Sequence, residues 1–349
     1  MQLYMVLFSR ISNGKLFLSN NSLFIHNMSV ISTHKVSIIT PCFNSMNYIE
    51  RTLVSVQAQT LSNWEYVVVD DGSTDGSAAV IEGYLDDEPR LQLVMQENSG
   101  CAHARNSGFV HSSSQSEYLL FLDADDCLEP EMLETICSYM DAHSEVGMTY
   151  CQYTLIDMDD RLISAREAGL TTGPRLAPYG MGIRALKAEE VRTPLTSIFT
   201  LTAGIIPSLA VFRRSVYEKT PGWDEEMSIL YEDVGLYIHI ALRSEVHFIS
   251  QPLVRYRRHS AQSTDAGKGR EREAMQQAKL YAKWNQLTGL PPEQQAMLNE
   301  ARAFREGRIV PFAGFHTGAA SLRSGQWGKA IRFYGGAIRR YAASFRGQA

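Results

Sequence analysis

The sequence predicts an α/β protein in which helices cover both faces of a mostly parallel sheet. Short apolar runs with the length of buried strands alternate with stretches whose apolar residues recur at helical spacing. Aspartate, glycine and proline end the apolar runs, as is typical at the ends of strands. Apolar residues make up 44% of the 349 residues and charged residues 20%, so the chain can form a full core.

The elements of this alternation follow one another from about residue 35. Four apolar runs are predicted as buried strands: residues 36–40 (VSIIT), 64–70 (WEYVVVD), 91–95 (LQLVM) and 118–122 (YLLFL). The helices predicted between them have their apolar faces at Ile49, Leu53 and Val56, at Val80, Ile81, Tyr84 and Leu85, and through residues 102–110. In such a sheet, ligands bind at the carboxyl ends of the strands, near the point where the strand order reverses.

The alternation weakens after residue 154. Residues 169–182 are rich in Gly and Pro and predict a long loop, regularity returns at residues 209–212, and a helix is predicted to begin near Glu232. From residue 267 the pattern is helical and charged. The sequence therefore divides into a poorly patterned leader (1–34), an α/β domain (35–265) and a helical C-terminal extension (266–349).

Charge and cysteine usage exclude several classes of protein. The net charge of −5 gives no reason to expect a nucleic acid partner. The five cysteines contain no CxxC pair, which argues against a disulfide framework and a structural zinc site and favours a reducing cytoplasm. No apolar run reaches the roughly 18 residues of a membrane-spanning helix.

Asp123, Asp125 and Asp126 directly follow the fourth predicted strand. Carboxylates alone would repel a diphosphate, so their grouping favours a bridging divalent cation, Mn²⁺ or Mg²⁺, that neutralises a departing nucleoside diphosphate. The alternative is a solvated acidic turn that caps the helix beginning beyond Glu129.

Two further runs follow the second and third predicted strands. Asp71, in residues 70–75 (DDGSTD), is suited to accept the imide N–H of a uracil ring, or else belongs to an ordinary strand-to-helix turn. Arg105, in residues 98–108, is suited to reach a phosphate or to steady the nearby aspartates. The glycines around Arg105 also fit a helix packed tightly on the sheet, and both interpretations can hold.

Acidic and basic runs in the second half complete the candidate set. Glu232 and Asp233, which follow the run 222–225 (GWDE), offer a base for an acceptor hydroxyl, or else cap a helix against its dipole. His259, in residues 256–260 (YRRHS), offers a neutral imidazole to Mn²⁺, or else is a surface histidine in a basic loop.

The order of these motifs resembles the family 2 glycosyltransferases of the GT-A fold. The resemblance covers about residues 35–265 and depends on VSIITPCFN, DDGSTD, NSGCAHARNSG, YLLFLDADD, PGWDEE, YEDVGLYIHI and YRRHSAQS. It implies a Rossmann-like sheet flanked by helices and an inverting hexosyl transfer by single in-line displacement, with an oxocarbenium-like transition state. It also implies a metal-dependent reaction.

The resemblance implies a role for each matching residue. On the donor side, Pro41 and Phe43 would lie against the nucleotide base, Asp71 would contact the base, and Arg105 would help to bind the donor. Asp123 and Asp125 would form the D-x-D pair, with Asp123 towards ribose and metal and Asp125 on the metal, and His259 would be a further metal or diphosphate ligand.

The resemblance also implies the catalytic and acceptor residues. Asp233 would be the general base with Glu232 beside it, and Trp223 and Asp224 would lie on the acceptor side.

The predicted function is sugar transfer from a nucleotide-sugar donor, with UDP favoured, to a hydroxyl of a glycan or lipid-linked acceptor in cell-surface polysaccharide biosynthesis. A Q-x-x-R-W motif is missing, which argues against a processive synthase. The rivals are a non-catalytic nucleotide-sugar-binding module and a sugar nucleotidyltransferase, which would usually show a Gly-rich basic loop after the first strand. An NAD-dependent dehydrogenase is disfavoured, since no G-x-G-x-x-G follows that strand.

The C-terminal extension suggests where the protein works. An apolar stripe runs from Trp327 to Phe345 with basic residues beside it. Either this helix packs on the domain or a partner, or it lies peripherally on the cytoplasmic face of an anionic membrane. The expected localisation is cytoplasmic, and the second of these alternatives adds a peripheral contact with the membrane.

Overall fold

The computed structural model describes residues 34–164, 167, 192–193, 195, 198, 205–227, 232–260, 262, 279–284, 287 and 289–304. The predicted leader up to residue 33, the predicted loop 169–182 and the apolar stripe from Trp327 to Phe345 lie outside these residues. Within the described residues, no helix combines the length and the apolar character needed to cross a membrane.

The centre of the described structure is one eight-stranded sheet with the order β3-β2-β1-β4-β7-β6-β8-β5. Its strands are β1 (Val36–Cys42), β2 (Trp64–Asp70), β3 (Leu91–Met95), β4 (Tyr118–Phe121), β5 (Cys127–Leu128), β6 (Val146–Ile156), β7 (Ala210–Arg213) and β8 (Glu245–Arg257). Strands β3, β2, β1 and β4 pair in parallel, as predicted. The second half of the sheet is mixed, because β7 is antiparallel to both β4 and β6, and β5 is antiparallel to β8.

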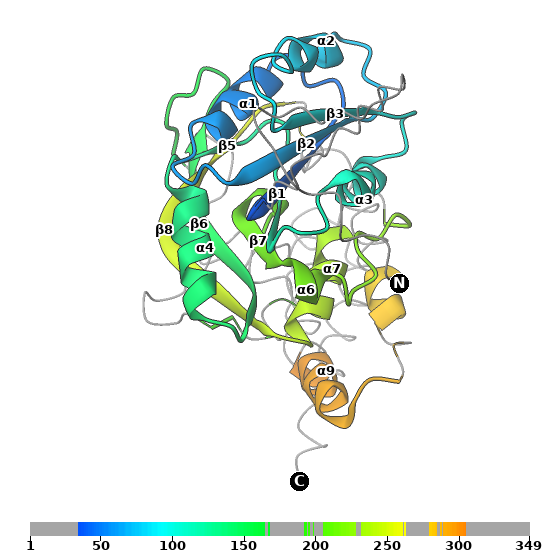
Figure 1. Cartoon of the computed structure of the whole chain (residues 1–349). Coiled ribbons are helices and arrows are strands. Elements are labelled where there is room, and N and C mark those ends of the chain that lie inside the picture. The colour runs from blue at the N-terminus through cyan, green and yellow to red at the C-terminus, as the bar shows by residue number, and fades with distance from the viewer. Residues whose placement is uncertain are drawn as a thin grey trace, which may run out of the picture. The chain divides into compact units, whose positions relative to one another are not determined.

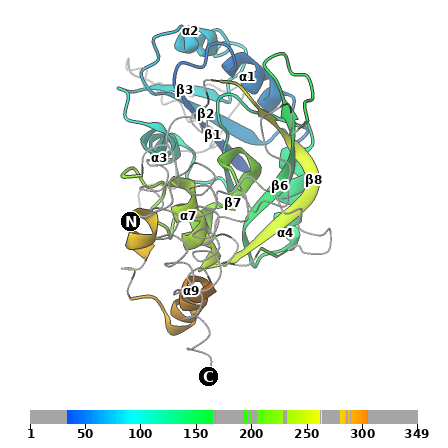
Figure 2. The same ribbon diagram turned by 180° about the vertical axis from the view of Figure 1, so that it is seen from behind.

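Helices lie on both faces of the parallel half. The helices are α1 (Ile49–Gln57), α2 (Ser77–Glu82), α3 (Cys101–His111), α4 (Met132–Ala142), α6 (Arg214–Tyr217), α7 (Glu232–Ala241) and α9 (Pro292–Phe304), with a short 3₁₀ helix at Pro207–Leu209. Figures 1 and 2 show α1 and α2 on one face of β1–β3 and α3 on the other. The strand order runs outward from β1 to β3 and then returns to β4, so the reversal lies between β1 and β4.

The predicted apolar faces form the core between these layers. Ile49, Leu53 and Val56 of α1 are all buried, as predicted. On the other face, α3 approaches the sheet closely at Gly108, where a Cβ atom would lie 2.4 Å from Ile39 Cγ2. The prediction that a glycine in this run lets the helix pack tightly on the sheet is therefore confirmed for Gly108.

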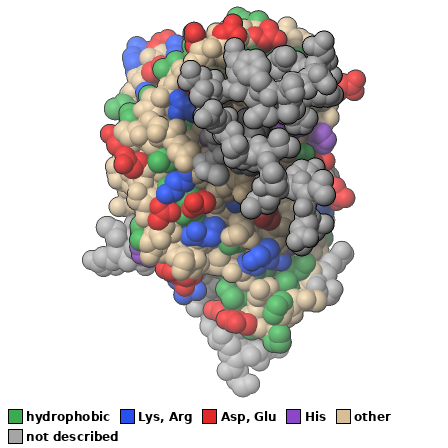
Figure 3. All heavy atoms as spheres, viewed as in Figure 1, with side chains coloured by type: hydrophobic (Ala, Val, Ile, Leu, Met, Phe, Trp, Pro, Cys, Tyr) green, Lys and Arg blue, Asp and Glu red, His purple; other side chains and the backbone are tan. Residues whose placement is uncertain are grey.

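The described surface carries charges of both signs. Figure 3 shows acidic and basic side chains interspersed over the described part of one face. The larger exposed apolar side chains include Phe43, Met95 and Val110. Phe43 directly follows β1, at the edge of the sheet where ligands are expected.

Candidate functional site

The predicted site residues gather around the carboxyl ends of β1, β2 and β4. Asp71 follows β2 and the Asp123–Asp126 loop follows β4. From outside the parallel half, α7 brings Glu232 and Asp233, and the end of β8 brings His259. This edge contains the β1/β4 reversal, where a doubly wound sheet opens a crevice for a ligand.

A buried arginine joins the loop after β4 to the start of α7. Arg105, on α3, donates from one guanidinium nitrogen to Asp123 Oδ1 at 2.7 Å and from the other to Glu232 Oε1 at 3.1 Å. Its guanidinium also lies 4.4 Å from the centre of the Trp223 ring. Arg105 is only 4% exposed, so these ion pairs lie in a region of low dielectric. The predicted contact of Arg105 with an aspartate is present at Asp123, and its contact with a phosphate of the donor stays a prediction.

The two adjacent carboxylates of α7 have different surroundings. Glu232 is 7% exposed and accepts hydrogen bonds from Arg105 and, at 3.6 Å, from the Cys101 thiol. Asp233 is half-buried and accepts a hydrogen bond from the backbone N–H of Val234. Burial, together with the negative charge of Glu232, raises the pKa of Asp233 to about 7. Arg105 therefore compensates Glu232, while Asp233 has the pKa expected of a general base.

The second carboxylate of the D-x-D pair meets the predicted histidine. Asp125 Oδ2 lies 2.9 Å from His259 Nε2. The imidazole stacks on the Tyr48 ring with 4.4 Å between the ring centres. Within the described residues, the buried His259 Nδ1 has no hydrogen-bond partner. The fold thus brings together two groups that are 134 positions apart in the sequence.

This pair offers two of the ligand types that Mn²⁺ accepts. A carboxylate oxygen and an imidazole nitrogen face each other at Asp125 and His259, which fits a divalent cation completed by diphosphate oxygens and water. Asp123 points instead to Arg105. Among the described residues, no three His, Cys, Asp or Glu side chains are grouped as a ready metal site.

Asp71 organises the loop that leads into α3. Its carboxylate accepts hydrogen bonds from the backbone N–H groups of Ser99 and Gly100, both at 2.8 Å, and from the side-chain amide of Gln96 at 2.7 Å. Gly72 and Gly100 have φ values of 77° and 92°, which other residues rarely adopt. Asp71 is 3% exposed. Contact with a nucleotide base stays a prediction for this residue.

Pro41 and Phe43 differ in their exposure. Pro41 is half-buried within β1, whereas the Phe43 side chain is 49% exposed. The turn after Phe43 is held by Asn44, whose backbone N–H donates to Ser73 Oγ and whose side chain accepts from the backbone N–H of Thr74. An exposed ring on a fixed turn is suited to stack on a planar base.

The two residues predicted on the acceptor side also differ. Trp223 is 2% exposed and its ring packs under Arg105. Asp224 is half-buried and is paired with Lys283 at 2.7 Å. The Asn106 side chain fixes this loop, because it accepts from the backbone N–H of Trp223 at 3.0 Å and donates to its carbonyl at 2.9 Å.

Asn106 and Lys283 also contact this loop, although no role was predicted for either residue. Asn106 follows Arg105 in residues 98–108 (NSGCAHARNSG), and this position beside a predicted site residue was the only sequence feature that pointed to it. Lys283 lies outside the region of resemblance, in a charged helical stretch, and no sequence signal pointed to it.

Comparisons with known proteins identify the family to which the chain belongs. The family described as glycosyl transferase family 2 matches residues 37–220. An uncharacterized glycosyltransferase of Nostoc sp. is 31% identical over 247 residues, which are 70% of this chain and 71% of that protein. The protein named "putative teichuronic acid biosynthesis glycosyltransferase TuaG" of Bacillus subtilis is 37% identical over 138 residues, or 38% of this chain and 54% of TuaG.

Solved structures share the fold at low sequence identity. The TarS 1–349 fragment of S. aureus in complex with UDP-GlcNAc has a TM-score of 0.59 and 20% identity, with 88% of this chain and 81% of that chain covered. The mannosyltransferase PcManGT of Pyrobaculum calidifontis, in complex with GDP-Man and Mn²⁺, has a TM-score of 0.56 and 22% identity, with 87% and 79% covered. The fold is that of GT-A glycosyltransferases, and the chain belongs to glycosyl transferase family 2.

Proposed function

We propose that this protein is a metal-dependent, inverting glycosyltransferase that moves a hexosyl group from a nucleotide sugar, with UDP as the favoured nucleotide, to a hydroxyl of a glycan or lipid-linked acceptor. The observation that carries the proposal is the difference between the two adjacent carboxylates at the start of α7. Glu232 is compensated by Arg105, and the adjacent Asp233 keeps a pKa of about 7. A binding module without catalysis has no need of such a base.

The proposed reaction is a single displacement at the anomeric carbon. Asp233 takes the proton of the acceptor hydroxyl as the acceptor oxygen forms its bond to the anomeric carbon. The bond between that carbon and the diphosphate oxygen breaks, and its electron pair leaves with the nucleoside diphosphate. Phe43 stacks on the nucleotide base. The loop whose backbone N–H groups bond to Asp71, together with Arg105 and its partner Asp123, lines the donor site. Positioning of donor and acceptor supplies much of the rate enhancement.

Asp125 and His259 are the residues proposed to hold the cation. When bound there, Mn²⁺ or Mg²⁺ would supply Lewis-acid stabilisation of the negative charge on the departing diphosphate. Their mutual contact at 2.9 Å supports this role, because it places a carboxylate oxygen and an imidazole nitrogen, two ligand types that Mn²⁺ accepts, next to each other.

The relatives support the proposed class of donor and acceptor. TarS is described with UDP-GlcNAc and UDP, and PcManGT with GDP-Man and Mn²⁺. TuaG is named for teichuronic acid biosynthesis. We extend these descriptions to a nucleotide-sugar donor and a cell-surface polysaccharide pathway for this chain, acting on the cytoplasmic side of the membrane.

Binding of donors is the first test of the proposal. We expect one nucleotide class among UDP-, dTDP-, GDP- and CDP-sugars to raise the melting temperature in the presence of Mn²⁺, because a ligand at 100 times its dissociation constant adds about 2.7 kcal/mol to stability. Asp125→Ala is expected to abolish the Mn²⁺-dependent part of this shift. Thermal-shift measurements with and without Mn²⁺ on both proteins give the result. No stabilisation of the wild type by any donor would contradict the proposal.

The pKa of Asp233 predicts the pH dependence of transfer. The base acts only when it is charged, so kcat should rise with pH through about 7 and fall by about tenfold for each pH unit below that value. Initial rates between pH 5.5 and 8.5, at saturating donor and acceptor, give the profile. Melting temperatures at each pH separate this effect from unfolding, and a flat profile between pH 5.5 and 7 would argue against Asp233 as the base.

A further inference from the structure

Two buried side chains bind three successive carbonyl groups of the loop after β4. Thr52 Oγ1 shares its proton between the carbonyl oxygens of Ala124, at 2.9 Å, and Asp126, at 2.8 Å. Arg257 Nε donates to the carbonyl oxygen of Asp125 at 2.9 Å. Both Thr52 and Arg257 are 0% exposed. The backbone that carries the Asp125 carboxylate is therefore fixed from two sides, by α1 and by β8.

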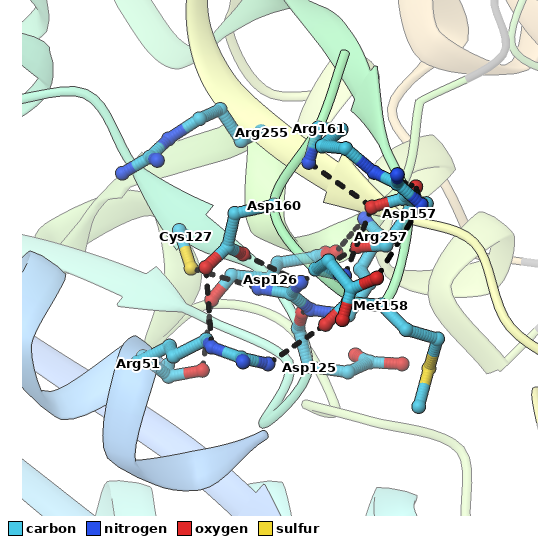
Figure 4. A network of polar contacts seen from close by, with 12 residues as sticks. Arg51, Asp125, Asp126, Cys127, Asp157, Met158, Asp160, Arg161, Arg255 and Arg257 are labelled. Carbon is cyan, nitrogen blue, oxygen red and sulfur yellow. Dashed lines mark hydrogen bonds and ion pairs between the residues drawn. The ribbon is translucent and has the colours of Figure 1, made fainter. Parts of the chain in front are cut away.

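Arg257 is itself held by a turn that lies beyond the site. Its guanidinium donates to the carbonyl oxygen of Asp157 at 2.8 Å and pairs with Asp160 Oδ1 at 2.6 Å. Asp160 Oδ2 pairs in turn with Arg51 of α1 at 3.1 Å, and Arg51 also donates to the carbonyl oxygen of Met158. Figure 4 shows this network, with the Arg257 guanidinium between Asp125 and Asp160.

The turn holds Asp160 in a conformation that few residues adopt. Asp160 has a φ of 64°, in the left-handed region where Asp and Asn are enriched. The turn is closed by the bridge between Ile156 and Leu162 and by hydrogen bonds from the backbone to the Asp157 side chain. This geometry aims the Asp160 carboxylate at Arg257.

The charge of Asp160 matters because Arg257 has no contact with solvent. A buried guanidinium is stable only when a carboxylate compensates it and its N–H groups are hydrogen-bonded. Among the described residues, Asp160 is the carboxylate that forms an ion pair with Arg257. Loss of that charge would leave the guanidinium uncompensated and would loosen its hydrogen bond to Asp125.

We propose that Arg257 is a positioning residue of the transfer site, and that Asp160 controls it. Through the Asp125 carbonyl, Arg257 sets the position of the Asp125 carboxylate opposite His259, which lies two residues further along the same chain. This inference rests on the proposed function, in which Asp125 and His259 hold the cation. Residues that orient metal ligands in this way typically change metal affinity by about 10–100-fold when they are replaced.

The test compares two aspartates of one turn. Asp160→Asn removes the charge that faces Arg257, and Asn keeps the preference for positive φ. Asp159→Asn is the matched control, since the Asp159 side chain is 73% exposed and pairs with the equally exposed Arg161. Mn²⁺ is titrated in the presence of UDP and, in a parallel series, GDP, with bound Mn²⁺ followed by electron paramagnetic resonance and melting temperatures measured without Mn²⁺.

We expect Asp160→Asn to need about tenfold more Mn²⁺ for half-saturation, and Asp159→Asn to remain within twofold of the wild type. Arg257→Lys should raise the Mn²⁺ concentration at half-saturation to a similar extent. The variant with both Asp160→Asn and Arg257→Lys should need no more Mn²⁺ than the more affected single variant, because both changes break the same series of contacts from Asp160 through Arg257 to Asp125. A lower melting temperature with unchanged half-saturation would mean a purely structural role and would overturn the inference. If the wild type itself shows no Mn²⁺-dependent binding of either nucleotide, the proposed function fails first and this inference with it.

Discussion

Asp233→Asn is expected to lower kcat by about 10²–10⁴-fold while nucleotide binding stays at the wild-type level. Asparagine has the shape of aspartate but cannot accept the acceptor proton at neutral pH. Asp233 pairs with no arginine in the described residues, in contrast to Glu232, so its replacement breaks no ion pair. The measurement is the initial rate of transfer, together with the Mn²⁺-dependent melting shift caused by the donor.

The same change should also raise the stability of the protein without ligand. Asp233 has a folded pKa above its ordinary value, so its contribution to stability is present at low pH and is lost as pH rises through about 7. Asparagine does not ionise, so the variant keeps this stability as pH rises. Asp86→Asn, at an exposed position beyond α2, is the control for the loss of a carboxylate. Full activity of Asp233→Asn with normal folding would exclude Asp233 as the base.

Arg105→Met is expected to destabilise the protein by about 3–5 kcal/mol, because it leaves the Asp123 and Glu232 carboxylates without their buried counter-charge. For a domain of this size, such a loss lowers the melting temperature by about 10 °C. Donor binding should weaken as well, since Asp123 loses the contact that holds it at 2.7 Å. Thermal unfolding followed by circular dichroism measures the first effect and donor titration the second.

Arg90→Met is a closely matched control. Arg90 also lies over an indole ring, 3.5 Å from the centre of Trp64, and also pairs with a glutamate, Glu88 at 2.7 Å. Its side chain is 30% exposed, whereas that of Arg105 is 5% exposed. A pair that reaches solvent contributes at most about 1 kcal/mol. An equal loss of unfolding free energy in the two variants would mean that the burial of Arg105 does not increase its contribution to stability.

The destabilisation by Arg105→Met should also depend on pH in a defined direction. Burial raises the pKa of Asp123 even with Arg105 beside it, and the loss of that cation would raise the pKa further. A carboxyl group whose folded pKa is raised stabilises the fold at low pH and loses this contribution as pH rises. The difference in melting temperature between wild type and variant should therefore widen from pH 5 to pH 8.

The strands of the first half of the fold could be predicted to within two residues, whereas the helix predicted to include Tyr84 and Leu85 ends at Glu82. The predicted runs 64–70 and 91–95 coincide with β2 and β3, and the predicted helix 102–110 lies within α3. Local apolar patterning predicts β2, which is buried along nearly its whole length. By contrast, β3 is an edge strand of the described sheet with Gln92 and Met95 exposed, so the prediction of a buried strand was wrong for residues 91–95. The long strands β6 and β8 were not predicted. Their pairing, with shifts of register between Val146 and Tyr153, depends on neighbours far away in the sequence.

For the site, the sequence by itself determined which residues reach the ligand-binding edge. Asp71 and Asp123 follow parallel strands, and parallel strands end at the same edge of a sheet, so their gathering follows from strand order alone. Their roles in binding stay predictions. The adjacent Glu232 and Asp233 cannot be told apart by any local pattern.

Only the tertiary structure decided how these residues are partnered. Arg105 reaches Glu232 across 127 positions, and Arg257 reaches Asp125 across 132, because helices and strands far apart in the chain pack against one shared loop. The raised pKa of Asp233 follows from its burial beside Glu232, and the hydrogen bond from Arg257 fixes the Asp125 carbonyl. Burial and the distance between charges set both properties, and both arise only when the layers have packed.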